Sequence, residues 1–158
     1  MSPGDTLPIG VTRMSESEIG SFISHRNVGV LGLPDQGAPY LIPMSFTFDD
    51  EQRLFFTFVL GTNSRKEALA DRAEQASFLV YDATSAFIWE SVVLTGELTQ
   101  LADDEEGEVR EVIDGAWRPE AFRNAGPGRE TKLFEFRIDE RIGLKGTGLP
   151  TELDGEES

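Results

Sequence analysis

The chain has 158 residues, of which 39 % are hydrophobic, and this suits one domain with a sizeable core. It carries 29 acidic residues against 14 Lys and Arg, and the net charge of −15 argues against a nucleic-acid or anionic-membrane partner. The absence of cysteine excludes disulfides, thiol catalysis and Cys–zinc sites. The acids are spread along the chain and arginine outnumbers lysine. This composition suggests adaptation to high salt, which screens self-repulsion.

The first half begins with residues 1–13, a segment expected to be flexible. No apolar run in it indicates a signal peptide or membrane span, so we expect a cytoplasmic protein. Ser15-Glu16-Ser17-Glu18 is a capping box, and the apolar spacing after it predicts a helix from Ser15 to about Arg26. The turn signals PDQG and DDEQ then separate three strands of an antiparallel meander, Val28–Leu33, Tyr40–Phe48 and Arg53–Leu60.

The second half is predicted to start with a helix over residues 64–73. Two strands follow, Ala76–Asp82 and Ala86–Leu101, and the second is expected to bend near Gly96. We expect an acidic surface helix from Asp103 to about Gly115, an irregular stretch over 116–130 and a final strand, Lys132–Lys145. The barrel domain should therefore cover residues 14–145, and the acidic tail, residues 146–158, is expected to be disordered.

Six strands joined by hairpins predict a mainly β fold, a small antiparallel barrel with a few short peripheral helices. The strand Arg53–Leu60 is apolar on both faces except for Thr57, so both faces need cover. The barrel interior covers one face, and we infer that a second copy in a homodimer covers the other. In Tyr40–Phe48 one face is Tyr40, Ile42, Met44, Phe46 and Phe48, and the other is Leu41, Pro43, Ser45 and Thr47.

The stretch GTNSRKEALADRA carries two of the scarce cations, Arg65 and Lys66, in the first turn of its predicted helix. Ser64 and Glu67 fit a second capping box, so both cations stand where the helix dipole disfavours positive charge by ~0.3–1 kcal/mol each. A bound phosphate would satisfy the free amides and both cations together. Two interpretations stay open, an anion site and ion pairs with surface acids. No second glycine directly precedes the lysine, which excludes a Walker loop.

The remaining polar motifs favour structural roles. His25 is the only histidine, lies at a helix end, and has no GxSxG motif to serve, so a Ser-His-Asp hydrolase is not expected. The acids between Asp103 and Glu108 suit a helix start and solvation better than a metal ion. We therefore expect no metal and assign no catalytic residue.

The segments YLIPMSFTF, SRKEAL and WESVVLTGEL resemble the pyridoxamine 5′-phosphate oxidase-like group of FMN-binding split barrels, and in particular its nitroimidazole-reductase-like branch. The resemblance covers about residues 14–145. It implies a six-stranded antiparallel split β-barrel that binds FMN as a homodimer. It also implies an oxidoreductase with a small-molecule substrate, and NAD(P)H is the expected electron donor.

Carried over position by position, the resemblance implies that Arg65 and Lys66 hold the FMN phosphate with Ser64 beside them. Phe56 and Thr57 would contact the ribityl–phosphate region. Ser91 would contact the flavin, often across the dimer interface, and Trp89 joins it because both share one strand face. The isoalloxazine ring and ribityl chain would be lined, largely through backbone groups, by Ile42, Pro43, Met44, Ser45 and Phe46.

Two departures bear on the substrate. Family members that oxidise pyridoxamine 5′-phosphate carry Arg and Trp in a C-terminal segment, whereas LPTELDGEES here has no base. Their additional strand arginines are replaced here by Trp89-Glu90-Ser91. We therefore expect a different substrate, which the sequence does not identify. Because the family also includes users of haem and of the deazaflavin F420, the alternatives are a non-catalytic flavin- or haem-binding module and an F420-dependent reductase.

Overall fold

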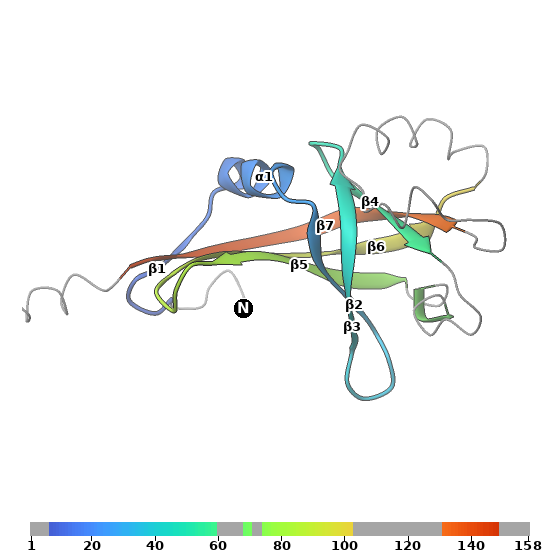
Figure 1. The fold of residues 1–158 in the computed structure, drawn as a ribbon, viewed down its shortest axis with the longest axis horizontal. Helices are drawn as coiled ribbons and strands as arrows, with labels where there is room; N and C mark the ends of the chain where they lie inside the picture. Colours follow the sequence, from blue (N-terminus) through green and yellow to red (C-terminus); the bar gives the residue numbers. More distant parts are fainter. Residues whose placement is uncertain (1–6, 60–67, 71–73, 103–130, 149–158) are drawn as a thin grey trace, which may run out of the picture.

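The computed structural model describes residues 7–59, 68–70, 74–102 and 131–148. The predicted acidic helix at Asp103–Gly115, the stretch 116–130, the tail beyond residue 148 and most of the helix 64–73 lie outside these ranges, although residues 68–70 are helical. The named elements are β1 (Val11–Arg13), α1 (Glu16–Ser24), β2 (Val28–Leu33), β3 (Tyr40–Phe48), β4 (Arg53–Val59), β5 (Gln75–Ala83), β6 (Ile88–Gln100) and β7 (Thr131–Thr147) (Figure 1).

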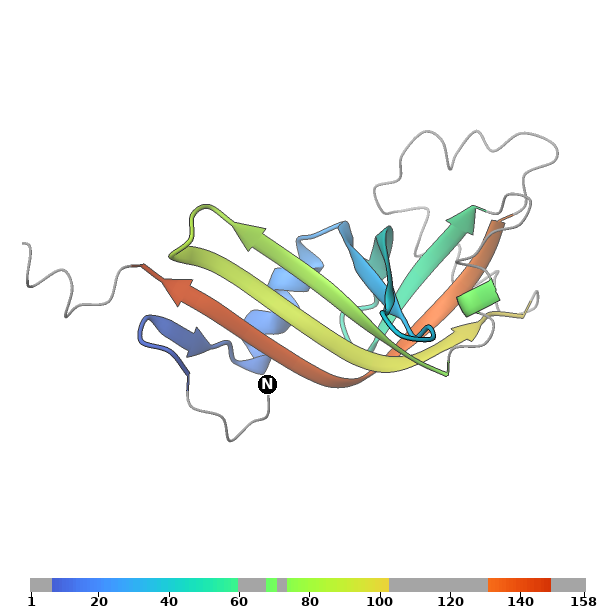
Figure 2. The same ribbon diagram turned by 90° about the horizontal axis from the view of Figure 1, so that it is seen from below.

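Six strands close into an antiparallel barrel, as predicted. The strand order is β7-β4-β3-β2-β5-β6, and the ring is completed by the pairing of β6 with β7. Figure 2 shows the long strands β5, β6 and β7 running side by side along the molecule. A seventh strand, β1, pairs with β7 through Val11↔Gly146, Thr12↔Lys145 and Arg13↔Leu144. The sequence pattern did not predict β1, since it placed these residues in a segment expected to be flexible.

The barrel closes because β7 is long enough to serve three partners. One edge pairs with β6 from Gln100↔Phe134 to Ile88↔Thr147, whereas the other edge pairs first with β4 and then with β1. The register of β6 on β7 shifts between Thr95 and Gly96, where the sequence predicts a bend. A β-bulge of this kind increases the local twist and helps a sheet to curl.

The barrel interior is filled mainly by phenylalanine side chains. Phe78 packs against Phe46 edge-on with ring centroids 5.2 Å apart, and against Phe56 at 4.9 Å. Phe56, Phe78, Phe134 and Phe136 are all at most 1 % exposed. These rings come from strands β4, β5 and β7, so the aromatic cluster connects strands that are distant in sequence.

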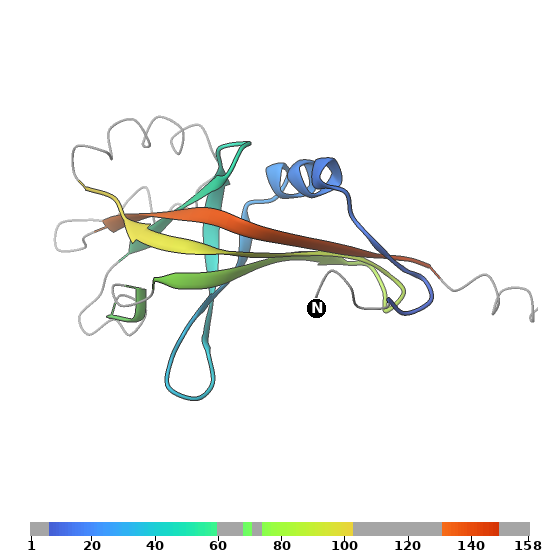
Figure 3. The ribbon, with the colours of Figure 1, turned by 180° about the vertical axis from the view of Figure 1, so that it is seen from behind.

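Helix α1 covers the inward face of the long strands where they extend beyond the barrel. Its predicted capping box is present, because the Glu18 amide donates to Ser15 Oγ and the Ser15 amide donates to Glu18 Oε1, both at 3.1 Å. Ile19, Phe22 and Ile23 are buried in the main core. Figures 1 and 3 show α1 and the tip of the β2–β3 hairpin on opposite sides of these strands. The helices in the described ranges are too short or too polar to cross a membrane.

Candidate functional site

The predicted phosphate-binding residues Ser64, Arg65 and Lys66 lie outside the described residues, so this part of the site stays a prediction. Two residues of the same predicted helix are described. Leu69 is 4 % exposed and Ala70 is 2 % exposed, and both belong to the main core. The segment that follows the SRK sequence is therefore packed on the barrel.

Strand β3 divides its predicted cofactor-binding residues between two faces. Met44 and Phe46 are 5 % and 4 % exposed and point into the core, and Ile42 packs partly against them. Pro43 is exposed and Ser45 is half-buried, so their side chains face outward. A ligand outside the barrel can therefore meet Ile42, Met44 and Phe46 only through their backbone, whereas it can contact the side chains of Pro43 and Ser45.

Strand β4 divides its two predicted residues in the same way. Phe56 is fully buried and pairs with Phe46 on β3, whereas Thr57 is half-buried on the outward side and lies opposite Leu133 of β7. Next to Thr57, Phe55 forms a second small buried cluster with Leu133 and Leu101. Thr57 is therefore the polar position of an otherwise apolar outward segment, as its place in the sequence indicates.

The outward side chains of the neighbouring strands form a continuous surface, which we call the outer face. The register places them in three adjacent rows across the sheet. The central row is entirely apolar, although Val93 within it is 41 % exposed, and Val28 and Tyr81 in the next row are 49 % and 60 % exposed. The rows are Pro43, Val30, Leu79, Val93 and Ile142; Ser45, Val28, Tyr81, Ser91, Leu144 and Arg13; and Ala83, Trp89, Gly146 and Val11.

Trp89 and Ser91 both lie on the outer face but at some distance from the β3 residues. Ser91 pairs with Tyr81 on β5 and Leu144 on β7, whereas Ser45 pairs with Val28 on β2. Strands β2 and β5 stand between them, and three strand spacings amount to about 14 Å. One chain therefore does not bring Ser91 and Trp89 together with Pro43 and Ser45.

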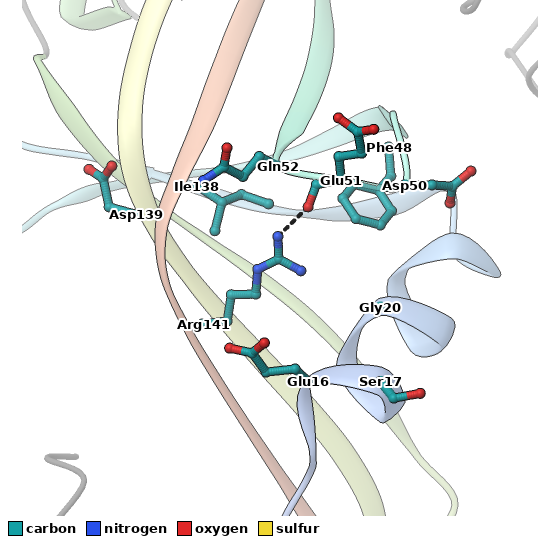
Figure 4. Close-up of a pocket in the computed structure, with 10 residues that line it drawn as sticks. All are labelled: Glu16, Ser17, Gly20, Phe48, Asp50, Glu51, Gln52, Ile138, Asp139 and Arg141. Atoms are coloured by element: carbon teal, nitrogen blue, oxygen red, sulfur yellow. Dashed lines mark hydrogen bonds between the residues drawn. The ribbon is translucent and has the colours of Figure 1, made fainter.

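A large cleft lies on the other side of β7, between α1 and the β3–β4 turn (Figure 4). It has a volume of about 610 Å³ and is lined by four acids, Glu16, Asp50, Glu51 and Asp139, and a single cation. That cation, Arg141, donates to the Glu51 carbonyl and lies 6.0 Å from the centroid of the Phe48 ring. In the described part of the chain, no group of three or more acids or histidines is placed to hold a metal ion.

The cleft is a poor match for the predicted cofactor. None of the described residues predicted to bind it lines the cleft, and a phosphate would meet mainly carboxylates there. The outer face carries Pro43, Ser45, Trp89 and Ser91 and is the better candidate site.

The ion pairs of α1 help to identify which side chains point away from the outer face. Lys145 donates to Glu18 Oε2, and this hydrogen bond and that from the Ser15 amide hold the pKa of Glu18 below its ordinary value. The Lys145 side chain therefore faces α1. Its neighbours Leu144 and Gly146 then face outward, because side chains alternate along a strand.

Sequence reasoning missed part of the outer face. It identified polar interruptions in the strands but not the apolar positions on either side, Val30, Leu79, Val93 and Ile142. The signal was present as alternation, since these positions sit between buried residues in β2, β5, β6 and β7. The fact that they form one row depends on the register between strands far apart in the chain.

Comparison with known proteins gives consistent results. The family model described as pyridoxamine 5′-phosphate oxidase matches residues 15–145. A FAD-binding protein from Mesorhizobium loti has a similar structure, with a TM-score of 0.69 and 20 % identity over 87 % of this chain and 98 % of its own. No curated protein matches the sequence.

Two further solved structures share the fold. A putative 5-nitroimidazole antibiotic resistance protein from Bacteroides thetaiotaomicron has a TM-score of 0.64 and 17 % identity, covering 87 % of this chain and 89 % of its own. A FAD- and haem-binding protein from Mycobacterium smegmatis has a TM-score of 0.66 and 19 % identity, covering 94 % and 80 %. Because the family model spans most of the sequence and the barrel is the one the resemblance implied, the chain belongs to the pyridoxamine 5′-phosphate oxidase-like split-barrel family.

Proposed function

We propose that this protein is an FMN-binding flavoprotein that acts as an oxidoreductase on a small organic substrate. The proposal is carried by the family match over residues 15–145, which includes the SRK, IPMS and SVVLTGEL segments. The FAD-binding proteins of Mesorhizobium loti and Mycobacterium smegmatis, which share the fold, support a flavin as the ligand. FMN, which has a single phosphate, suits the one pair of adjacent cations, Arg65 and Lys66.

The residues of this chain fit such a cofactor in chemistry. Arg65 and Lys66 would neutralise the phosphate, and Ser64 would add a hydroxyl donor. The outward side chains of Pro43 and Ser45 and the backbone of Ile42, Met44 and Phe46 would line the ring and ribityl chain. Thr57, with Phe56 behind it in the core, would contact the ribityl–phosphate region. The bound flavin supplies the redox chemistry, so no protein acid or base is assigned.

A homodimer would complete the site. The central row of the outer face is apolar across five strands in a chain of net charge −15, and a row of this kind is typical of a surface covered by a partner. A second copy is the occupant we propose. It would bring Trp89 and Ser91 to the cofactor held by the first copy, because about 14 Å separates Ser91 from Ser45 within one chain.

The reaction would transfer a pair of electrons. A nicotinamide donor, NAD(P)H, would be oxidised by giving a hydride to the flavin, and the flavin would pass two electrons to an organic acceptor that takes up the proton. These nucleotides are plentiful in the cytoplasm, where we propose that the protein works. The protein would bind the phosphate, exclude water from the ring and orient donor and acceptor in turn.

The test begins with whatever absorbs visible light in the purified protein. We expect a flavin spectrum, a released cofactor with the mass of FMN, and bleaching of the flavin band when NAD(P)H is added without oxygen. The double variant Arg65→Ala with Lys66→Ala should purify colourless and should not be reconstituted by FMN. The single variant Arg137→Ala, which removes an exposed cation from the outside of the barrel, should retain the cofactor.

Several outcomes would argue against the proposal. A double variant that stays fully yellow would remove the phosphate assignment. A Soret band would indicate haem, and the mass of a deazaflavin would indicate an F420-dependent protein. A stably bound flavin that no nicotinamide reduces would favour a non-catalytic flavin-binding module.

A further inference from the structure

The three rows of the outer face contain almost no charge. In the whole sequence 27 % of residues are charged, and the opposite side of the same strands carries Asp82, Glu90, Arg141 and Lys145. Among the described residues that make up the three rows, Arg13 is the single charged one. A lone cation on a face that otherwise excludes charge needs a chemical reason, because charge is depleted from the centres of interfaces.

The topology fixes the side on which Arg13 stands. Thr12 lies opposite Lys145, whose ammonium binds Glu18 of α1, so Thr12 faces the α1 side. Arg13 lies opposite Leu144 and therefore faces outward, and it is exposed. Strand β1 is the end of the strand order, and Arg13 consequently lies at the edge of the outer face.

Trp89 lies near Arg13 in a position that Gly146 makes possible. A Cβ added to Gly146 would stand 2.6 Å from Trp89 Nε1 and 2.6 Å from the Phe87 carbonyl oxygen. The indole therefore lies against the β7 backbone at Gly146, and the residue on its other side, Ala83, is also small. The half-buried ring forms an aromatic platform directed towards β1.

We propose that Arg13 and Trp89, with Ser91 between them, form a subsite for a planar organic anion. The ring of the ligand would stack on the indole and its carboxylate would bind the guanidinium. Strand spacing and rise put the Cα atoms of Trp89 and Arg13 about 12 Å apart, and the two side chains close part of that distance around one aromatic ring. The inference rests on the proposed function in that the ligand is the substrate presented to the flavin.

A purely structural explanation makes different predictions. Trp89 on Gly146 would then only shield a glycine in the sheet, and Arg13 would serve only its contact within the chain. A guanidinium has five donors, so one internal contact leaves capacity for a ligand. Loss of a structural role would change stability without changing the selectivity between charged and neutral ligands.

The experiment uses benzoate as the probe and benzamide as its neutral isostere. The parent protein is the full chain with Trp117→Phe, which leaves Trp89 as the sole tryptophan of the two in the sequence. Binding is measured by calorimetry, Trp89 emission is recorded separately, and flavin content is determined on every sample. The variants are Arg13→Gln, Gly146→Ala and the matched control Arg137→Gln, which removes an equally exposed arginine outside the three rows.

We expect Arg13→Gln to weaken benzoate binding at least about tenfold and to leave the weaker benzamide binding unchanged. Arg137→Gln should bind both as the parent does. Gly146→Ala should shift Trp89 emission and weaken both ligands. The subsite is refuted if benzoate gives no binding heat, or if Arg13→Gln and Arg137→Gln bind it equally.

Flavin content separates this result from that of the proposed function. Arg13-dependent benzoate binding in protein without flavin would support the subsite and contradict the flavoprotein. Flavin-loaded protein that ignores benzoate would do the reverse.

Discussion

The carbonyl oxygen of Arg137 lies 1.9 Å from the point that a Cβ on Gly96 would occupy. The obstructing atoms are backbone atoms of β7, so no side-chain rotation relieves the clash. It coincides with the register shift that lets β6 and β7 bend together and close the barrel. We expect Gly96→Ala to lower the free energy of unfolding by about 3 kcal/mol, measured by urea denaturation.

A second glycine gives the matched control. Gly20 lies in the middle of α1, and a Cβ there would meet nothing within 4 Å. Gly20→Ala should raise the free energy of unfolding by about 0.5–1 kcal/mol, because alanine loses less backbone entropy in a helix. If both variants lost similar stability, the explanation from the close approach of β6 and β7 would be wrong.

The strands of the barrel could be predicted because each carries its own signal. Alternation and turn residues are local, and Tyr40–Phe48 appears in the structure with the predicted bounds and the predicted inward and outward faces. Strand β1 carries no such signal. Its three residues, Val11 to Arg13, are too few for alternation to register, and their partner on β7 lies more than 130 positions away.

The candidate site was predicted less completely for the same reason. Residue type identified Ser45 and Ser91 as polar interruptions, but their placement about 14 Å apart follows from strand order, which no local pattern contains. The seat of Trp89 on Gly146 also depends on register. The SRK sequence keeps the status it has from the sequence, because residues 64–66 lie outside the described ranges.

The turn between β3 and β4 depends on one carboxylate. Asp49 Oδ1 accepts from the amides of Glu51, Gln52 and Arg53 at 2.9–3.0 Å, and Oδ2 accepts from Arg53 Nε at 2.9 Å. Burial opposes ionisation, but these hydrogen bonds outweigh it and hold the pKa of Asp49 below its ordinary value. Asp49→Ala should therefore cost about 2–3 kcal/mol of stability at neutral pH.

The pH dependence of that loss has a definite sign. A depressed folded-state pKa stabilises the protein above the unfolded pKa of about 3.9, and the stabilisation disappears as pH falls through the folded value. The difference between wild type and Asp49→Ala should thus shrink when denaturation is repeated below about pH 4. Glu51→Gln, in the same turn and exposed, should show little loss at either pH. A gap between wild type and Asp49→Ala that stays constant with pH would contradict the role of the charge.

The proposed dimer can be tested at the centre of the outer face. Val93 lies in the entirely apolar row and is 41 % exposed in the single chain. Val93→Asp would place a charge in the interface of both copies, and we expect the dimer dissociation constant to rise more than about a hundredfold, measured by sedimentation velocity. Ser17→Asp adds the same charge on exposed α1 and should leave association unchanged. Wild-type protein that sediments as a monomer at all concentrations would refute the interface.

Salt should stabilise this protein through its charge rather than through its core. A net charge of −15 on 158 residues produces self-repulsion that opposes the compact state. The Debye length falls from about 10 Å at 0.1 M to about 3 Å at 1 M salt, so KCl should remove most of that repulsion. We expect the melting temperature to rise by several degrees between about 0.1 and 1 M KCl and to level off beyond it. Sucrose, which acts by exclusion without screening, should not reproduce this shape. The triple variant Glu97→Gln, Asp139→Asn and Glu140→Gln removes three exposed negative charges and should melt higher at low salt with a weaker response to KCl. Equal salt responses in the triple variant and the wild type would mean that repulsion between the acids does not limit stability, and the adaptation to high salt would then have no support in the fold.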